Sequence, residues 1–363
     1  MPPDPSLDAA TGEARRQVGI CNACRYCEGY CAVFPAMTRN KSFAGADLLH
    51  LANLCHNCRG CFYACQYTAP HEFALNLPAA LAELRQGSWE AASRPRGLAR
   101  LFHRSAAAQA AVLVVATLLI ALAAALLRPA GGRAFYATLS HGTLVAIFGT
   151  VFGLALLALA AGLRRYWRDS GGGRVRLADL IAALQDAARL RNLDGGQGQG
   201  CNFEAGDRYS NARRWAHQAT LWGFLLCFAA TCVATVMHYA FALHAPYGPF
   251  SPPKLLGLPG GLLLCTGTLW LATLKRRADP ALGATGLRKG ESGFTWMLFW
   301  TGASGLALYA ARGGVLATPL LIVHLGAVLA LFALLPYSKM VHGAYRLAAL
   351  TSEAARRRAA RAH

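Results

Sequence analysis

The sequence predicts an all-α protein in which a small helical module precedes a bundle of six transmembrane helices. Three observations predict this fold: 55% of the 363 residues are apolar, eight of the twelve cysteines lie between Cys21 and Cys65, and long uncharged stretches follow them. These features divide the chain into a cysteine-rich cytoplasmic domain at 1–93, a basic linker at 94–104, a membrane domain at 105–345 and a basic cytoplasmic tail at 346–363.

The cysteine-rich domain contains two copies of one pattern. The runs CNACRYCEGYC and CHNCRGCFYAC both have the spacing C-x2-C-x2-C-x3-C. This spacing is typical of ferredoxin-like modules with two 4Fe-4S clusters, in which three cysteines of a motif bind one cluster and the fourth binds the other. It predicts one cluster on Cys21, Cys24, Cys27 and Cys65, and a second on Cys55, Cys58, Cys61 and Cys31.

Zinc and disulfides are the alternatives for these thiols. An all-cysteine zinc site usually combines two separated cysteine pairs, which a triplet plus a distant fourth thiol does not match. The first twenty residues do not resemble a signal peptide, so we expect a reducing cytoplasmic environment in which disulfides are rare. One departure from the ferredoxin pattern is that Ala32 and Gln66, instead of proline, follow the fourth cysteines. The remaining cysteines are predicted to be ordinary small residues: Cys201, Cys227, Cys232 and Cys265.

Six uncharged stretches follow the cysteine-rich domain. Each is about as long as the roughly 20 residues that a helix needs to cross a ~30 Å hydrocarbon core. The expected cores of the spans are 106–127, 142–162, 217–239, 257–274, 294–311 and 317–337. The polar connection at 164–214 contains a predicted surface helix at 175–193, followed by the loop GGQGQG, which we expect to be flexible.

The positive charges orient the bundle. Lys and Arg outnumber Asp and Glu by 36 to 17, and ten arginines lie in the single connection at 164–214. The connections on the opposite side contain few cations, so the positive-inside rule places both termini in the cytoplasm. We therefore expect a multi-pass protein of the bacterial inner (cytoplasmic) membrane, surrounded by lipid bilayer, with no nucleic acid as a partner.

Histidines near the ends of the spans are candidate haem ligands, because neutral imidazole is an axial ligand of b-type haem and is costly in a bilayer without a partner. On ideal helices His324 and His342 share one face ~27 Å apart, and His217 and His238 lie ~31 Å apart. The direction of the spans pairs His217 with His342 on the cytoplasmic side and His238 with His324 on the far side. One or two b-type haems are predicted. His141 could replace His238 or line a quinone pocket.

Several runs of the sequence resemble known families. The end of the sixth span, HLGAVLALFALLPYSKMVH, resembles the haem-bearing gamma subunit of respiratory nitrate reductase. Together with the two cysteine motifs, GCNFE and RRWAHQATLWGFLLCFAATCVAT, the chain resembles the tricarballylate-utilisation protein B family, also called citrate-utilisation protein B, over nearly its full length. This resemblance implies a soluble FAD-dependent dehydrogenase, acting on tricarballylate, as the partner that supplies electrons.

The sequence therefore predicts a membrane electron-transfer protein without a catalytic acid or base. Electrons would pass from the flavin of the dehydrogenase through two 4Fe-4S clusters and b-type haem to membrane quinone. One alternative is a membrane subunit of a heterodisulfide-reductase-like or nitrate-reductase-like complex, although disulfide chemistry would call for a further cysteine-rich domain. The other alternative is a redox or iron sensor, which would call for a signalling output domain.

Overall fold

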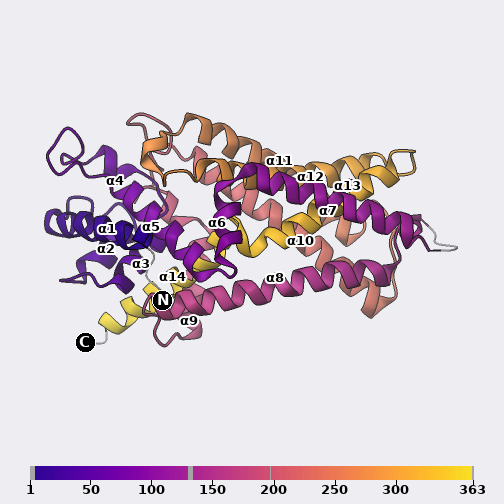
Figure 1. Ribbon diagram of the computed structural model, residues 1–363, viewed down its shortest axis with the longest axis horizontal. Coiled ribbons are helices and arrows are strands. Elements are labelled where there is room, and N and C mark those ends of the chain that lie inside the picture. Colours follow the sequence, from indigo (N-terminus) through magenta and orange to yellow (C-terminus); the bar gives the residue numbers. More distant parts are fainter. Residues whose placement is uncertain (1–4, 130–133, 197, 362–363) are drawn as a thin grey trace.

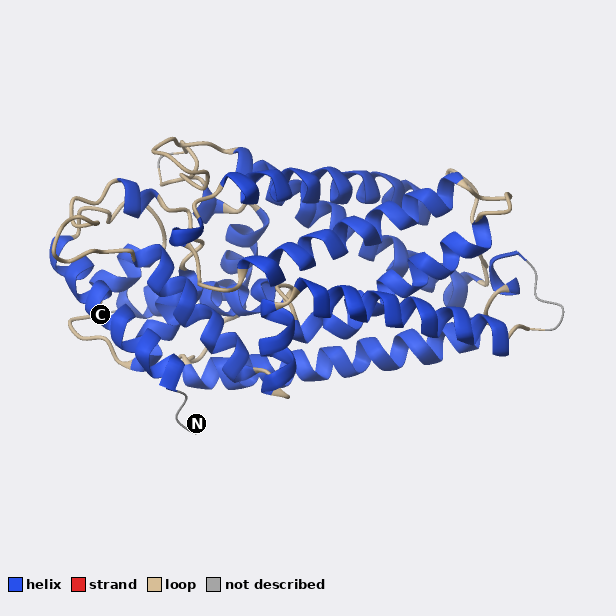
Figure 2. Ribbon diagram, turned by 45° about the horizontal axis from the view of Figure 1, so that its top comes forward, coloured by secondary structure: helices blue, strands red, loops and turns tan. Residues whose placement is uncertain are grey.

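A computed structural model describes residues 5–129, 134–196 and 198–361 as one elongated helical molecule (Figures 1 and 2). Within these ranges there is no strand, and one isolated antiparallel bridge joins Cys201 to Ser210. The first residues of the predicted cysteine-rich domain, Gln197 of the predicted flexible loop and the last two residues of the predicted tail lie outside the described ranges. The all-α prediction is confirmed.

The cysteine-rich residues form one end of the molecule, which we call the module end (Figure 1). The long helices extend from it to the opposite end, the far end, where the connecting residues 127–129, 134–140, 242–251 and 311–316 lie. Both described termini lie at the module end (Figure 1). The chain therefore passes along the bundle an even number of times.

Five helices build the module. They are α1 (Pro5–Cys24), α2 (Val33–Thr38), α3 (Gly45–Leu54), α4 (Gly60–Tyr63) and α5 (Leu77–Ala92). Apolar side chains from all but the short α4 meet in one core whose central members, Val18, Met37, Leu48 and Leu84, have no solvent exposure. The first cysteine motif begins within α1, and the second begins at the end of α3, so the module core holds both motifs in place.

The predicted basic linker forms the short helix α6 (Arg96–Arg104). Arg100 and Arg104 lie one turn apart and form ion pairs with Glu90 of α5, at 3.7 Å and 3.4 Å. Ser105 ends this helix and caps the next one, because its side-chain oxygen accepts a hydrogen bond from the Ala108 N–H at 3.1 Å. The chain thus turns sharply from the module into the bundle.

Six long helices form the bundle. They are α7 (Ala106–Leu126), α8 (His141–Asp169), α10 (Ala212–Phe241), α11 (Pro252–Arg277), α12 (Arg288–Ala310) and α13 (Ala317–Leu334). Shorter 3-10 turns lie at η1 (Ala134–Ala137) and η3 (Pro280–Leu282). Among the described residues, five helices are long and apolar enough to cross a membrane; these are all of the six except α12.

Helix α12 occupies the place of the fifth predicted span. It packs between α11, α13 and α7, and its Phe294 and Met297 are each only 4% exposed. Its small and polar residues keep it below the hydropathy of a candidate membrane span. Thr295, Gly302 and Ser304 are buried against neighbouring helices, where small and polar side chains suit close helix packing. Trp296 and Trp300 are 36% and 55% exposed.

The outward faces of the bundle are strongly apolar. Leu118 and Leu122 of α7 are 62% and 53% exposed, and Leu154 and Leu157 of α8 are 62% and 69% exposed. A continuous apolar surface of this kind is unfavourable in water and requires a lipid or protein neighbour. Together with the lengths of the helices, it is consistent with membrane association.

The sixth predicted span does not continue as one helix to His342. Helix α13 ends at Leu334, a 3-10 turn follows at η4 (Leu335–Tyr337), and α14 (Val341–Arg361) begins after it. Pro336 in this turn has no N–H to extend the helical hydrogen bonding. The expectation that His324 and His342 lie on one ideal helix is therefore wrong, because they belong to α13 and α14.

The connection between α8 and α10 contains α9 (Leu177–Ala188) and η2 (Arg191–Leu193), so the predicted surface helix is present but shorter than expected. Asp179 of α9 accepts two hydrogen bonds from the Arg358 guanidinium of α14, at 3.1 Å and 2.9 Å. This bidentate ion pair attaches the connection to the last helix of the chain.

The glycine-rich loop after η2 packs against the first cysteine motif. Gly196 has a φ of +83°, and a Cβ atom added to it would lie 2.1 Å from the Gly29 carbonyl oxygen. The described part of the loop thus makes close backbone contact with the segment between Cys27 and Cys31, where we expected a free flexible loop. Only glycine allows both this φ and this approach.

Candidate metal centres

Residues with left-handed backbone conformation bend both cysteine motifs. Arg25, between the second and third cysteines of the first motif, has a φ of 58°, and Asn57 and Arg59 in the second motif have φ values of 52° and 69°. Such values are uncommon for residues other than glycine. Each bend changes the chain direction between successive cysteines, so that several thiols of one motif can face the same space.

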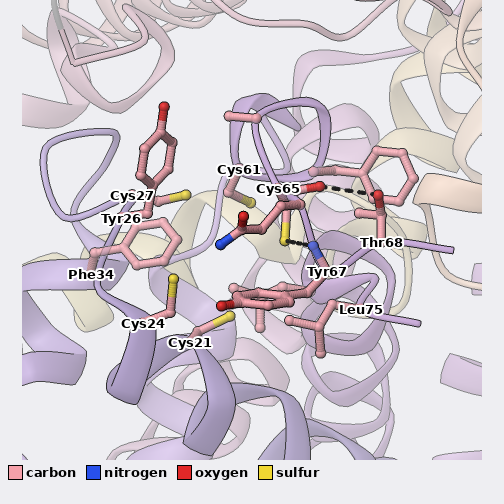
Figure 3. Close-up of a pocket in the computed structure, with 14 residues that line it drawn as sticks. Cys21, Cys24, Tyr26, Cys27, Phe34, Cys61, Cys65, Tyr67, Thr68 and Leu75 are labelled. Carbon is pink, nitrogen blue, oxygen red and sulfur yellow. Dashed lines mark hydrogen bonds between the residues drawn. The ribbon is translucent and has the colours of Figure 1, made fainter. Parts of the chain in front are cut away.

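The first set of thiols, which we call the outer cysteine group, consists of Cys21, Cys24, Cys27 and Cys65. Figure 3 shows these side chains around one cavity of about 280 Å³, together with Cys61. Aromatic residues complete much of the lining: Tyr26, Phe34, Phe62 and Tyr67. The Tyr67 backbone N–H donates a 3.4 Å hydrogen bond to the Cys65 sulfur (Figure 3).

Burial and mutual repulsion disfavour ionisation of the outer thiols in the protein alone. Burial, and then the nearby thiol of Cys65, raise the pKa of Cys21 and of Cys27 to about 12. Bound iron would supply the positive charge that stabilises the thiolates, since metal binding to cysteine releases the thiol proton. The outer group therefore has the donor chemistry of a site that is completed by a cationic centre.

The second set, the inner cysteine group, consists of Cys31, Cys55, Cys58 and Cys61. The Cys31 thiol forms a hydrogen bond with Cys58, and this bond together with burial raises the pKa of Cys31 well above its ordinary value. The same hydrogen bond lowers the pKa of Cys58 to about 6. The structure therefore brings Cys31 to the second motif and Cys65 to the first, while their role as ligands stays a prediction.

The thiols are spread around a space and do not converge on a point. In the described part of the chain, no three His, Cys, Asp or Glu side chains are arranged to hold a single metal ion. A 4Fe-4S cluster is itself a cube of iron and sulfide, so its four thiolates lie further apart than the ligands of one tetrahedral ion. The donor set and the cavity thus fit a cluster better than they fit zinc.

All twelve cysteines lie within the described ranges and none of them forms a disulfide. The outer group opens to solvent, because Cys24 is exposed and its neighbour Tyr26 is 70% exposed. The inner group is more enclosed, because Cys55 and Cys58 are 9% and 8% exposed and its other two thiols are half-buried, whereas only Cys27 of the outer group is buried. The two groups therefore share one spacing pattern but differ in solvent access.

A segment far along the chain covers the inner group. The Asn202 N–H donates a 2.9 Å hydrogen bond to the Cys58 carbonyl. The neighbouring Phe203 ring contacts the guanidinium groups of Arg59 and Arg213, at 4.8 Å and 4.1 Å from the ring centre. These residues belong to the run GCNFE, which sequence reasoning noted only as part of a resemblance. Their contact with the second motif was not predicted.

Two of the candidate haem ligands face one another. The ring centres of His217 in α10 and His342 in α14 lie 5.9 Å apart, with the rings at 77° to each other. Metal–nitrogen bonds of roughly 2 Å place two imidazole ring centres about 6 Å apart when one ion lies between them. The pair predicted for the cytoplasmic side is thus brought together at the spacing of two axial ligands.

A hydrogen bond fixes the tautomer of the neutral His342 ring. Its Nδ1 donates to the Lys339 carbonyl, which leaves Nε2 without a proton and available as a metal ligand. The Nδ1 of His217 is buried without a hydrogen-bond partner among the described residues. Lys339 is held in turn by Glu291, which also forms an ion pair with Lys275 at 3.4 Å.

His238 and His324, predicted as a pair, contact other residues. His238 stacks on His141 with ring centres 3.8 Å apart, and its Nδ1 lies 3.0 Å from Nδ1 of His244. The His324 Nδ1 lies instead 3.1 Å from the Ser304 hydroxyl. The described contacts therefore place His238 with His141 and His324 with Ser304, and the expected pairing of His238 with His324 stays a prediction.

The reason for this difference is depth along the bundle. His238 is three residues from the end of α10 and His141 is the first residue of α8, so both lie at the far end. His324 is seven residues into α13, about 10 Å from the start of that helix, whereas His238 is about 5 Å from the end of α10. The spacing of histidines along a helix predicts at which end of the bundle each histidine lies, but it does not predict how far each lies from that end.

Fold and site together define a class of protein. It is a helical, membrane-associated protein with a ferredoxin-like cysteine module at one end and a histidine pair where that module meets the bundle. Comparisons with known proteins then identify the family. The chain belongs to the citrate utilization protein B family: the family model "Citrate utilization protein B" matches residues 95–363, and the model of its Fer4-like domain matches residues 14–91.

The relatives agree with this assignment. The chain is similar to "Citrate utilization protein B" of Escherichia coli, with 42% identity over 357 residues, covering 97% of this chain and 94% of that protein. No solved structure matches the chain. The Fer4-like domain indicates iron–sulfur clusters and an electron-transfer role.

Proposed function

We propose that this protein is a membrane electron-transfer protein that reoxidises the FAD of a soluble dehydrogenase and passes the electrons to membrane quinone. Two 4Fe-4S clusters, on the outer and inner cysteine groups, and one b-type haem, between His217 and His342, are the proposed carriers. When bound, these groups supply one-electron redox chemistry, which converts the two-electron reaction of a flavin into single steps.

One observation carries this proposal. The loop that contains Cys55 contacts the same two helices that bear the histidine pair. Arg213, four residues before His217, and Arg346, four residues after His342, both donate hydrogen bonds to backbone carbonyls of the second motif. The inner group therefore lies beside the proposed haem ligands, and the outer group lies beside the inner one.

The side chains of the protein would bind the clusters and haem, orient them and enclose them. The eight cysteines of the two groups act as ligands. Cys61 lies between the two groups, because it belongs to the inner group and also lines the cavity of the outer group. Around the histidine pair, Ala216, Val341 and Tyr345 are at most 1% exposed. Val341 and Tyr345 pack with Trp89 of α5 and Tyr166 of α8, so this part of the joint between module and bundle is closed to solvent.

The partner is proposed to dock at the outer group. Tyr26 and Cys24 are exposed there, so a flavin on a partner surface can approach the cavity, whereas the inner group is covered. The name of the Escherichia coli relative supports a role in tricarboxylate metabolism. We propose tricarballylate as the substrate of the dehydrogenase, with no site for this acid on the present chain.

Membrane placement completes the proposal. The arginine-rich module end is proposed to face the cytoplasm, with both termini on that side, in the inner membrane of a bacterium. Quinone is the proposed acceptor within the bilayer. His141 is a candidate for a quinone site because its Nε2 lies 2.9 Å from the Tyr239 hydroxyl at the lipid-exposed far end.

Metal and haem content test the carriers directly. Protein purified anaerobically in detergent is expected to contain about eight cluster irons and one haem iron per chain. Dithionite reduction is expected to produce b-haem absorption bands and low-temperature paramagnetic signals of reduced clusters. A sample that is reconstituted with iron and sulfide, but shows neither bands nor cluster signals, would rule out the proposal.

The direction of electron flow is tested with the partner. The soluble flavoprotein, reduced by tricarballylate, is expected to reduce the haem of this protein in lipid nanodiscs, and an added quinone is expected to reoxidise it. Tyr26→Glu is expected to slow the first step without changing dithionite reduction. Haem reduction that is unaffected by the presence of the flavoprotein would contradict the proposed partner.

A further inference from the structure

Three arginines from three helices converge on the loop of the inner cysteine group. Arg85 of α5 donates to the Cys55 carbonyl at 2.8 Å, and Arg346 of α14 donates to the same oxygen at 3.0 Å. Arg213 of α10 donates to the Asn57 carbonyl at 2.7 Å and to the His56 carbonyl at 3.0 Å. Module and bundle are therefore joined at the backbone that presents the inner thiols.

The positions of two of these arginines follow from helical geometry. Residues four apart lie on one face of a helix. Arg213 thus shares a face with His217 on α10, and Arg346 shares a face with His342 on α14. Each histidine of the pair is consequently one helical turn from a side chain that hydrogen-bonds to the second motif.

None of the three guanidinium groups lies within ion-pair distance of a described carboxylate. The Glu291 carboxylate acts on Arg85 and Arg346 at longer range, but it is already paired with Lys275 and Lys339. Each of the three arginines donates to backbone carbonyls or contacts an aromatic ring. Arg85 is only 5% exposed. Arg59, inside the motif, is also 5% exposed and donates to the Asn57 side chain and the Phe203 carbonyl. Buried cations of this kind are unfavourable unless an anion lies close by.

A cluster held by four thiolates is such an anion, and it gains one further negative charge on reduction. Nearby fixed positive charge therefore stabilises the reduced state more than the oxidised state. No arginine lines the cavity of the outer group. Arg25 of the first motif donates to the Asn22 carbonyl at 3.1 Å, but it is exposed, so solvent screens its charge. The two groups thus differ in electrostatic surroundings.

We propose that Arg85, Arg213 and Arg346 are positioning residues that make the inner cluster the stronger oxidant of the two and hold it beside the histidine pair. This inference rests on the proposed function. In the step that it directs, one electron leaves the outer cluster and one enters the inner cluster, with no bond made and no proton transferred. Reduced flavin of the partner supplies the electrons, in two successive steps.

The test is a redox titration of the purified membrane protein, followed by paramagnetic resonance of both clusters. Removing one charge at about 10 Å, in a medium of effective dielectric constant about 20, changes a one-electron equilibrium roughly tenfold. For Arg346→Gln we expect the ratio of reduced to oxidised inner cluster at a fixed potential to fall about tenfold, or 59 mV for one electron. The outer cluster is expected to be unchanged.

Two controls separate charge from structure. Arg346→Lys keeps the charge and is expected to restore most of the inner-cluster potential. Arg358→Gln removes an arginine from the same helix that pairs with Asp179, away from the cysteine loop, and is expected to shift neither cluster. Arg213→Gln and Arg85→Gln provide independent replacements if Arg346→Gln reduces the yield of folded protein.

The outcomes distinguish this inference from the function on which it rests. Two clusters with unshifted potentials in all three glutamine variants would overturn the inference and leave the proposed function intact. Equal shifts of both clusters would also overturn it, because the charges would then not act on the inner group selectively. Absence of clusters from the wild-type protein would instead refute the proposed function itself.

Discussion

The two cysteine groups have the same spacing in the sequence and opposite surroundings in the structure. The outer group opens to solvent beside Tyr26, and its cavity contains no charged lining residue. The inner group is enclosed by the GCNFE segment and by arginines from α5, α10 and α14. Identical ligand patterns can therefore supply two sites with different roles, and the role is set by residues distant in sequence.

The largest expected effect comes from replacing the fourth cysteine of either motif by serine. Because Cys31 lies with the second motif and Cys65 with the first, Cys31→Ser is expected to damage the inner cluster and Cys65→Ser the outer one. Each variant is expected to lose up to about four of eight cluster irons. Iron and sulfide analysis with paramagnetic resonance measures this. If each variant instead lost the cluster bound by the other three cysteines of its own motif, the predicted exchange of fourth ligands between the motifs would be wrong.

Removing the histidine pair is expected to remove haem and to leave both cysteine groups intact. His217→Ala and His342→Ala each delete one of two facing rings, so haem content per chain is expected to fall at least tenfold. His324→Ala and His238→Ala are the matched controls, because their described contacts are with Ser304 and with His141. Haem loss in the controls alone would place the haem elsewhere.

The contact of the glycine loop with the first motif can be broken at one residue. Gly196→Val puts a Cβ atom 2.1 Å from the Gly29 carbonyl oxygen and is expected to cost about 2–4 kcal/mol. Gly198→Val is the control, since this glycine has the same φ of +83° and no atom within 4 Å of the added carbon. Thermal loss of cluster absorbance is expected at lower temperature for Gly196→Val than for Gly198→Val, because Gly29 lies between Cys27 and Cys31. If both variants lost cluster absorbance at the same lowered temperature, the backbone strain of valine at a φ of +83° would explain the effect, and the contact with Gly29 would not.

A smaller effect is expected at the joint between α3 and α14. The Glu353 carboxylate lies 3.2 Å from Nε2 of His50 and also pairs with Arg39. Glu353→Gln is expected to lower the free energy of unfolding by about 1–3 kcal/mol. Glu72→Gln, on an exposed carboxylate, is the control. Thermal denaturation in detergent measures both, and equal stabilities would show that the joint contributes nothing.

The same joint predicts a pH dependence. Burial lowers the pKa of His50 below its ordinary value of 6.5, and hydrogen bonds from His50 and Arg39 outweigh burial and lower the pKa of Glu353 below 4.5. Unfolding lets both groups bind protons more readily, so stability is expected to fall as the pH drops below about 6.5 and again below about 4.5. In Glu353→Gln the second decrease is expected to be smaller. An unchanged profile would contradict this assignment.

The sequence was sufficient where a pattern is local. Cysteine spacing predicted that Cys31 lies with the thiols of the second motif and Cys65 with those of the first. The direction of the spans predicted that His217 lies beside His342. Both depend on short-range geometry or on the alternation of helices, which a sequence displays directly. The length of uncharged stretches also predicted all six long helices, although α12 proved less apolar than a typical span.

Other features depend on contacts that no local pattern records. His238 and His324 were paired because of helix direction, but the turn at which each lies within its helix sets its depth. Arg213 and Arg346 were counted among the charges that orient a membrane protein, yet they contact Asn57 and Cys55. Arg213 and Asn57 are 156 residues apart in the sequence, and Arg346 and Cys55 are 291 residues apart. Such contacts follow from the packing of whole helices.

The hydrogen bond from Arg346 to Cys55 also concerns biosynthesis. Cys55 is translated early, whereas Arg346 belongs to the last helix of the described chain, 291 residues later. The thiols of both groups lie within the first 65 residues and emerge from the ribosome together, but the inner group is fully enclosed only after α14 has been made and has docked. Under the proposed function, we expect iron–sulfur maturation of the inner site to depend on completion of the helical bundle, and a chain truncated before α14 to lack the enclosed inner site.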